Sequence, residues 1–250
     1  MSANFTVITL FPEMFPGPLE HSLSGKALEK KEWKLRVINM RDFSHSKHHK
    51  VDDTSFGGDF GLVIMCDVVH DALVYALTLH KNPIIVYLSP KGEVFKQEHV
   101  KRFWHRHSET NTRSSFAEAQ DDELEIIFLC GRYEGIDERV LEYWRENHGL
   151  IELSLGDFIL SGGEVAAITM MDAILRYQTV ERKETLAYES FENCLLEYPH
   201  YTKPREWKGK QVPEVLLSGH HGDIAKWKKE MSEKITKEKR LDLWQKYLKT

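Results

Sequence analysis

Five short apolar runs, separated by helix-like patterns, constrain the fold of this chain more than any other feature. Several of the runs are almost continuously apolar, which is typical of strands covered on both faces. The runs are FTVITLF (5–11), WKLRVINM (33–40), NPIIVYLS (82–89), LEIIFLC (124–130) and LIELSLGDF (150–158). Strands that alternate with helices predict an α/β fold with a mainly parallel sheet.

Two helices are predicted from apolar residues at spacings of three and four, over 67–80 and 165–177. Two other segments interrupt the alternation. Residues 106–123 are polar and aperiodic, which predicts a long surface loop, and we read it as an insertion without an assigned function. Residues 181–190 are also polar and follow the second helix, so they are a candidate linker.

The C-terminal part predicts a separate, mainly helical domain. Turn-rich sequence is followed by two amphipathic patterns, one marked by Ile224, Trp227, Met231 and Ile235 and the other by Leu241, Trp244, Tyr247 and Leu248. The expected organisation is therefore a first domain over 1–180, a linker over 181–191 and a basic helical domain over 192–250.

Composition narrows the class of protein. The 250 residues are 41% hydrophobic and 29% charged, as in an ordinary globular protein. No apolar run approaches the roughly 18 residues that a membrane span needs. The N-terminus lacks the features of a secretion signal, and the three cysteines are widely spaced, so we expect a reducing, cytoplasmic location.

Charge is distributed unevenly along the chain. From His200 to the end, the chain has 13 Lys and Arg and 7 Asp and Glu, which gives a net charge of +6. The rest of the chain has 21 Lys and Arg and 32 Asp and Glu, which gives a net charge of −11. A basic tail on an acidic body favours a polyanionic partner such as a nucleic acid. A solvated lysine-rich helix explains the same charges without a partner.

Four glycine-rich segments are candidate ligand loops, and three of them directly follow predicted strands. They are DTSFGGDFG (53–61), YLSPKG (87–92), CGRYEGID (130–137) and SLGDFILSGGE (154–164). Ligands of open α/β sheets bind at the carboxyl ends of strands, although tight turns use the same residue types. The loops contain neither a P-loop lysine nor G-x-G-x-x-G after the first strand. This favours an adenosine without phosphates, as in S-adenosylmethionine, over NAD or ATP.

Several motifs occur in the order found in one enzyme family. They are TLFPEMF (9–15), RDFSHSKHHKVDD (41–53), YLSP (87–90), CGRYEGIDERV (130–140), GDFILSGGE (156–164), SF (190–191), YPHYTKP (198–204) and VLLSGHH (215–221). Over nearly its whole length the chain resembles the bacterial tRNA (guanine-N1)-methyltransferases of the SPOUT class.

The resemblance implies a SPOUT-type parallel sheet with a trefoil knot in the C-terminal half of the first domain, followed by a small, mainly helical domain. It also implies a homodimer with its active site at the subunit interface. The methyl donor is S-adenosylmethionine, and the product is 1-methylguanosine at position 37, beside the anticodon, where a guanosine precedes it. Mg²⁺ dependence is implied as well, without assigned protein ligands.

The resemblance assigns the methyl donor to three loops. The residues carried over are Tyr87, Leu88, Ser89, Pro90, Gly131, Tyr133, Glu134, Ser154, Leu155, Gly156, Asp157, Phe158, Ile159, Leu160, Gly162 and Gly163. Glu134 is expected to face the amino group or the sulfonium of the donor. Two departures alter the pattern: Ala166 stands where the family often has Pro, and GGDFG (57–61) replaces Gly-Gly-Gly-Pro-Gly. Asp59 and Phe60 are expected to change the target-base pocket.

Three residues are catalytic candidates by the same resemblance. Glu189, in AYESF, stands where the family has an aspartate that removes the proton from guanine N1; alone it reads as a solvated linker residue. Arg176 aligns with an arginine that faces guanine O6, although a helix C-terminal arginine commonly binds carbonyls. Asp52 carries over as an acid near the target nucleotide, or is a turn residue.

The remaining candidates concern RNA. His45, His48 and His49 lack the further ligands of a tetrahedral metal site, so we expect polar loop residues that approach RNA phosphates. The basic side chains of the last domain are expected to contact the anticodon arm; they are Lys203, Arg205, Lys208, Lys226, Lys228 and Lys229. Two alternatives stay open: a tRNA-binding module that has lost catalysis, and a Rossmann-type nucleotide enzyme, which the missing glycine fingerprint disfavours.

Overall fold

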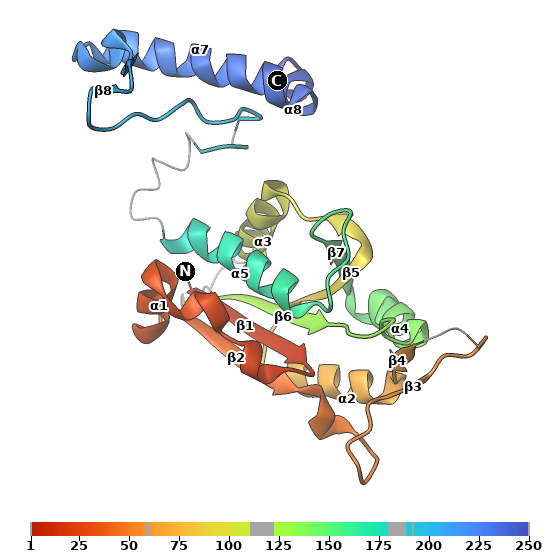
Figure 1. Cartoon of the computed structure of the whole chain (residues 1–250). Coiled ribbons are helices and arrows are strands. Elements are labelled where there is room, and N and C mark those ends of the chain that lie inside the picture. Colours follow the sequence, from red (N-terminus) through yellow and green to blue (C-terminus); the bar gives the residue numbers. More distant parts are fainter. Residues whose placement is uncertain (1, 59–60, 111–122, 180–188, 192, 250) are drawn as a thin grey trace. The chain divides into compact units, whose positions relative to one another are not determined.

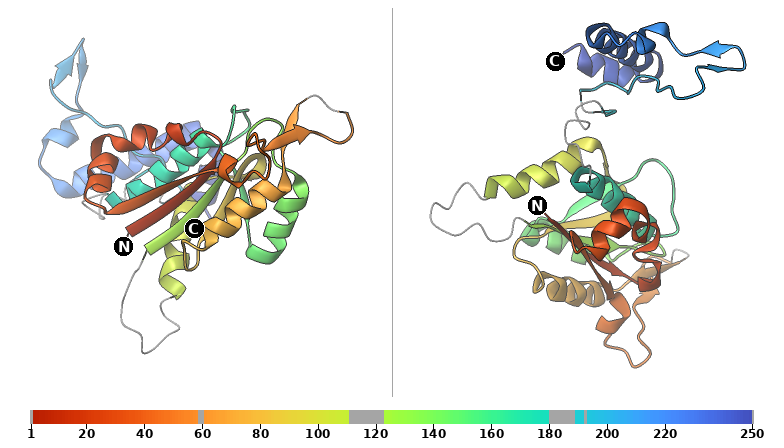
Figure 2. Two further views of the ribbon diagram at one scale, coloured as in Figure 1. Left: turned by 90° about the horizontal axis from the view of Figure 1, so that it is seen from below. Right: turned by 90° about the vertical axis from the view of Figure 1, so that its left-hand side faces the viewer.

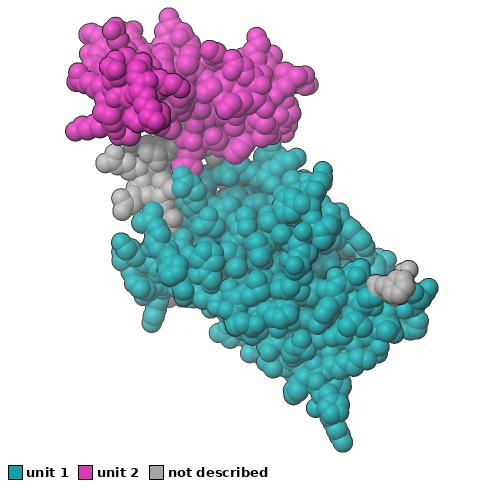
Figure 3. Space-filling view, in the orientation of Figure 1, with its two compact units in different colours: residues 1–179 teal, residues 180–250 magenta. Residues whose placement is uncertain are grey.

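The chain divides into two compact units, which Figure 3 colours separately. The computed structural model describes residues 2–58, 61–110, 123–179, 189–191 and 193–249. Unit 1 spans residues 1–179 and unit 2 spans residues 180–250. Most of the expected linker (181–188) and of the expected insertion (111–122) lies outside the described residues.

Unit 1 is built on one five-stranded sheet whose paired strands all run parallel (Figure 1). The strand order is β2-β1-β6-β5-β7, so the first and the sixth strand lie at its centre. The bounds are β1 (Ser2–Thr9), β2 (Trp33–Asn39), β5 (Ile84–Val94), β6 (Glu123–Cys130) and β7 (Ile151–Ser154). The predicted parallel α/β fold is confirmed.

Helices cover both faces of this sheet, and the strands alternate between two cores (Figure 2). Phe128 faces the core beneath α1, α3 and α5, whereas its neighbours Ile127 and Leu129 face the core beneath α2 and α4. Strands covered on both faces must be apolar along their whole length, which explains the continuous runs. The helices are α1 (Ser22–Glu29), α2 (Cys66–Leu77), α3 (Gln97–Thr110), α4 (Glu138–His148) and α5 (Glu164–Thr179).

Short elements connect these layers at the carboxyl end of the sheet. The antiparallel pair β3 (Asp52–Thr54) and β4 (Leu62–Ile64) contacts the segment after β6, where the Ile64 amide donates to Gly135 O at 2.9 Å. The 3-10 helices are η1 (Pro12–Met14), η2 (Gly17–Glu20) and η3 (Met40–Phe43).

Two sequence predictions need correction. The run 150–158 is a strand only over β7, because the chain turns at Gly156, whose φ is +146° and whose amide donates to the Ser154 hydroxyl. The predicted loop 106–123 is also shorter than expected: residues 106–110 continue α3, and Glu123 begins β6. Val100, Phe103 and Trp104 give α3 a buried stripe at helical spacing, which its many polar residues concealed.

The described residues of unit 2 form two α-helices and a small hairpin. The helices are α7 (His221–Lys239) and α8 (Leu241–Tyr247), as the amphipathic patterns predict, and η5 (Glu214–Leu217) precedes them. The hairpin is formed by β8 (Glu206–Trp207) and β9 (Lys210–Gln211). Among the described helices of both units, none is long and apolar enough to cross a membrane.

We predict that Phe128→Ala lowers the free energy of unfolding by about 3 to 5 kcal/mol, because the ring is fully buried at the centre of the sheet. Phe56→Ala is the matched control, since the Phe56 side chain is 97% exposed, and its effect should stay within about 0.5 kcal/mol. Urea unfolding of both variants measures the difference. Equal stability of the two variants would contradict the described core.

Candidate functional site

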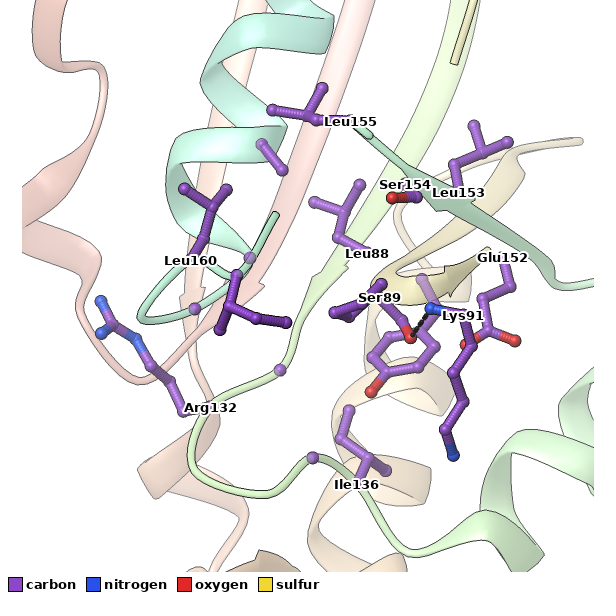
Figure 4. A pocket seen from close by; sticks show the side chains of 18 of the residues that line it. Leu88, Ser89, Lys91, Arg132, Ile136, Glu152, Leu153, Ser154, Leu155 and Leu160 are labelled. Atoms are coloured by element: carbon purple, nitrogen blue, oxygen red, sulfur yellow. Dashed lines mark hydrogen bonds between the residues drawn. The ribbon is translucent and has the colours of Figure 1, made fainter. Parts of the chain in front are cut away.

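A cavity of about 320 Å³ lies at the carboxyl ends of three neighbouring strands, β5, β6 and β7 (Figure 4). Its walls are formed by residues 87–91 within β5 and by the segments that follow β6 and β7, so the three predicted ligand loops meet in one place. Apolar side chains from β5, β7, α4 and α5 and from the segments after β6 and β7 make up much of the lining. They are Leu88, Ile136, Leu141, Leu153, Leu155, Leu160 and Ala166.

The cavity brings together all but one of the residues that the resemblance assigns to the methyl donor. Asp157 is the exception and does not line it. The lining also includes Lys91, Arg132, Glu138, Glu152 and Ser161, which were not singled out from the sequence. Ala166 lines the cavity and is buried, so the departure from Pro at this position concerns the site directly. Asp59 and Phe60 lie outside the described residues.

The first wall is formed by a break in the pairing of β5. Leu88 and Glu93 both pair with Leu153 of β7, so the residues between them bulge out of the ladder. The Ser89 hydroxyl holds the bulge by accepting from the Lys91 amide at 3.1 Å. Gly92 allows the return to the ladder, because a Cβ there would lie 2.5 Å from the backbone nitrogen of Leu153.

Close backbone approaches define the other walls. A Cβ at Gly163 would lie 2.9 Å from Cα of Cys130, so only glycine lets α5 begin against the end of β6. The Gly163 amide donates to Gly131 O at 3.0 Å across this contact. Tyr133 has a φ of +58°, which is uncommon for a bulky residue and often marks a functional position.

Each cation that lines the cavity lies near a carboxylate. Its lining cations are Lys91, whose Nζ lies 3.9 Å from Glu138, and Arg132, whose Nε lies 3.0 Å from Glu164. Three lining carboxylates, on Glu134, Glu138 and Glu152, outnumber them. The lining therefore favours a neutral or cationic ligand over one that carries phosphates.

Tyr87 forms part of the cavity floor as a neutral phenol. Burial raises the pKa of Tyr87 to about 12, and the carboxylates of Glu152 and Glu138 add to the effect. Tyr87 therefore keeps its proton at neutral pH and can donate a hydrogen bond.

A buried network connects two of these loops to strand β1 of the sheet. The Thr9 hydroxyl, at the end of β1, donates to Glu164 Oε1 at 2.7 Å. The other Glu164 oxygen faces Arg132 in an ion pair whose geometry falls short of a hydrogen bond. Arg132 also donates to Ser161 O at 3.0 Å and lies 4.3 Å from the centre of the Phe11 ring. Both charged residues lie within recognised motifs, but only the tertiary contact reveals that they pair.

The three catalytic candidates lie outside the cavity lining. Asp52 is in β3, opposite Ile64 of the strand that contacts the loop after β6. Arg176 is exposed in the last turns of α5. Glu189 belongs to unit 2, at the start of a turn in which the Ser190 hydroxyl accepts from the Glu197 amide at 3.1 Å. The turn is held against α7, because the Leu196 amide donates to the buried Thr236 hydroxyl at 2.8 Å.

The histidine candidates are exposed loop residues. His45 contacts Asp71 at 2.8 Å, and His49 contacts the carbonyl of Arg41 at 3.2 Å. Within the part of the chain that the structure describes, no group of three His, Cys, Asp or Glu side chains could hold a metal ion.

Comparisons with known proteins agree across the chain. Residues 3–246 match the family model described as tRNA (Guanine-1)-methyltransferase TrmD. The chain is 46% identical over 250 residues to a tRNA (guanine-N(1)-)-methyltransferase of Rhodospirillum rubrum, covering 99% of this chain and 95% of that protein. Proteins of the same name from Ruegeria sp. (45% identical, 96% of this chain and 91% of that protein) and Brucella ovis (44%, 98% and 92%) are similarly close.

We predict that Glu164→Gln lowers the free energy of unfolding by about 3 to 5 kcal/mol, because it leaves the Arg132 charge buried without its counter-ion. Glu142→Gln, on the exposed face of α4, is the control and should change stability by less than about 0.5 kcal/mol. Denaturant titration of both variants provides the measurement. If Glu164→Gln matched the control, the pair would have no structural role.

Proposed function

Because the chain belongs to the tRNA (guanine-N1)-methyltransferase family, we propose that it transfers a methyl group from S-adenosylmethionine to N1 of guanosine 37 in tRNA. The observation that carries the proposal is the cavity at the ends of β5, β6 and β7, whose cations are paired and whose walls are apolar. An adenosine that carries a sulfonium matches such a lining better than a nucleotide with phosphates.

The cavity residues divide between the parts of this donor. The apolar side chains from the strand ends would pack on the adenine, as in other ligand sites. Backbone N–H and C=O groups of the lining segments would bind the polar edges of the base and ribose, apart from the Gly163 amide and the Gly131 carbonyl, which bond to each other. Glu134 would oppose the positive charge of the amino group or of the sulfonium. The Glu134 side chain lies against Gly61, where a Cβ would be 2.4 Å from Glu134 Cγ.

The reaction needs a base, since N1 of guanine carries a proton at neutral pH. When bound, S-adenosylmethionine supplies an electrophilic methyl group. In this proposal the Glu189 carboxylate accepts the N1 proton, and the N1 electron pair forms the new bond to the methyl carbon. The bond between the methyl carbon and sulfur breaks, and its electrons remain on sulfur. Arg176 donates hydrogen bonds to O6, where negative charge develops, and its fixed fork of donors suits this role. Asp52 contacts the target nucleotide.

We further propose a trefoil knot in unit 1. The path of the chain supports it: β7 pairs with β5, yet the residues after β7 contact the segment that follows β6. The chain therefore passes the carboxyl end of β5 between these two points before α5 begins.

A homodimer with the active site at the subunit interface completes the proposal. Exposed apolar side chains support it: Phe158 and Ile159, which line the cavity, and Val165 would be covered by a partner. The basic unit 2 would bind the anticodon arm. Sedimentation should then give twice the 29.2 kDa mass of one chain.

Mg²⁺ dependence stays a prediction. Magnesium commonly keeps several of its water ligands and binds substrate phosphates, so it does not need many ligands from the protein.

Labelled S-adenosylmethionine and tRNA transcripts with G or A at position 37 test the proposed activity. Label should enter only the G37 transcript. Binding of tRNA without any transfer of label would support the alternative, a tRNA-binding module of the same fold that has lost catalysis.

We predict that Glu189→Gln lowers the single-turnover rate at least about 100-fold, because the amide cannot accept the N1 proton. The affinity for S-adenosylmethionine should stay near that of the wild type, and Glu189→Asp should recover part of the rate. Glu197→Gln, in the same turn, is the matched control with an expected change below about twofold. An active Glu189→Gln enzyme would show that another group removes the proton.

A further inference from the structure

The β8–β9 hairpin carries an exposed indole whose exposure the fold does not explain. Glu206 pairs with Gln211 and Trp207 with Lys210, so the ladder has only two residue pairs. Lys208 (φ +52°) and Gly209 (φ +75°) form the loop, and two left-handed residues are what a tight two-residue hairpin requires. The hairpin projects away from α7 and α8 within unit 2 (Figure 2). Arg205–Gln211 are called the hairpin platform below.

Trp207 is the most exposed of the described Phe, Tyr and Trp residues of this unit. Tyr201, which packs on Trp227, is 48% exposed and Phe191 is 45% exposed, whereas Trp207 is 60% exposed and has the Lys208 ammonium 5.0 Å from the centre of its ring. A large apolar ring in water contributes little to the stability of so short a hairpin, since burial is what makes such a side chain stabilising. Contact with a ligand explains the exposed position of Trp207 better than a contribution to the stability of the hairpin does.

The surroundings of the ring are strongly basic. Lys203, Arg205, Lys208 and Lys210 are all exposed, and the carboxylate between them, Glu206, accepts a hydrogen bond from the side chain of Gln211. Four cations against one carboxylate leave a charge of +3 over residues 203–211. An aromatic face surrounded by cations matches a nucleobase flanked by phosphates, because every base has a π-face that can stack.

We propose that the hairpin platform stacks Trp207 on an unpaired base of the tRNA while its lysines and arginine contact the adjoining phosphates. The inference rests on the proposed function, which makes tRNA the substrate. It adds a base-stacking contact to the phosphate contacts expected from basic side chains. Lys208 contributes twice, through its charge and by its position over the Trp207 ring.

Binding of the full-length protein to the tRNA transcript, measured over a series of salt concentrations, tests this contact. Trp207→Ala should weaken tRNA binding by about 5- to 150-fold, the range of one lost stacking contact. Trp207→Phe should recover most of the affinity because it keeps a π-face. The salt slope should be unchanged in both variants. Lys210→Ala should instead reduce the slope of log K against log salt by roughly 0.7 to 0.9.

Leu248→Ala is the control, since Leu248 is 66% exposed in the same unit beside Lys249 but has no π-face; tRNA affinity should change by less than about twofold. An unchanged tRNA affinity of Trp207→Ala would overturn the inference. If the sedimentation mass of this variant also changed while its tRNA affinity did not, Trp207 would contact a protein instead of RNA. The proposed activity fails separately, if the wild type binds tRNA but transfers no methyl group. Circular dichroism of each variant verifies that unit 2 stays folded.

Discussion

The buried pair of Arg132 and Glu164 is the interaction on which the arrangement of the cavity depends. Glu164 is the first residue of α5, Arg132 belongs to the segment after β6, and Thr9 ends β1. The pair therefore fixes three parts of the chain that are far apart in sequence. Its carboxylate also lies at a helix N-terminus, where the helix dipole favours negative charge. Gly162 is required beside it, because a Cβ there would lie 2.3 Å from Arg132 Nε.

The same pair also affects the charge of the cavity lining. Arg132 lines the cavity, but its charge is directed to Glu164 and is not available to a ligand phosphate. Lys91 faces Glu138, and Arg145 lies 3.4 Å from Glu138 and 3.5 Å from Glu152. Glycines and apolar side chains make up much of the remaining lining, so recognition would depend on backbone groups and shape.

The sequence predicted those parts of the fold that depend on local pattern. Continuous apolar runs identified the five parallel strands, because strands covered on both faces cannot alternate with polar residues. The strand over 150–158 was overextended, since its end depends on a turn between Ser154 and Gly156 that the apolar pattern does not reveal. The helix α3 was missed, although Val100, Phe103 and Trp104 have the spacing that would have identified it.

The site was predictable to a smaller degree, because it depends on contacts between distant segments. The loops after β5, β6 and β7 were recognised from their residue types, and the cavity unites them except for Asp157. The pairing of Arg132 with Glu164 could not be predicted, since neither residue is unusual in its own motif. The exposed position of Trp207 likewise follows from a hairpin that shows no apolar periodicity.

We propose that the pairing of its cations makes this cavity a site for an adenosine ligand without phosphates. Calorimetric titration of the full-length protein with S-adenosylmethionine, ATP and NAD at low salt tests this proposal. We expect S-adenosylmethionine to bind at one site per chain, and neither ATP nor NAD to displace it. Displacement by ATP at comparable concentration would show that the cavity accepts phosphates.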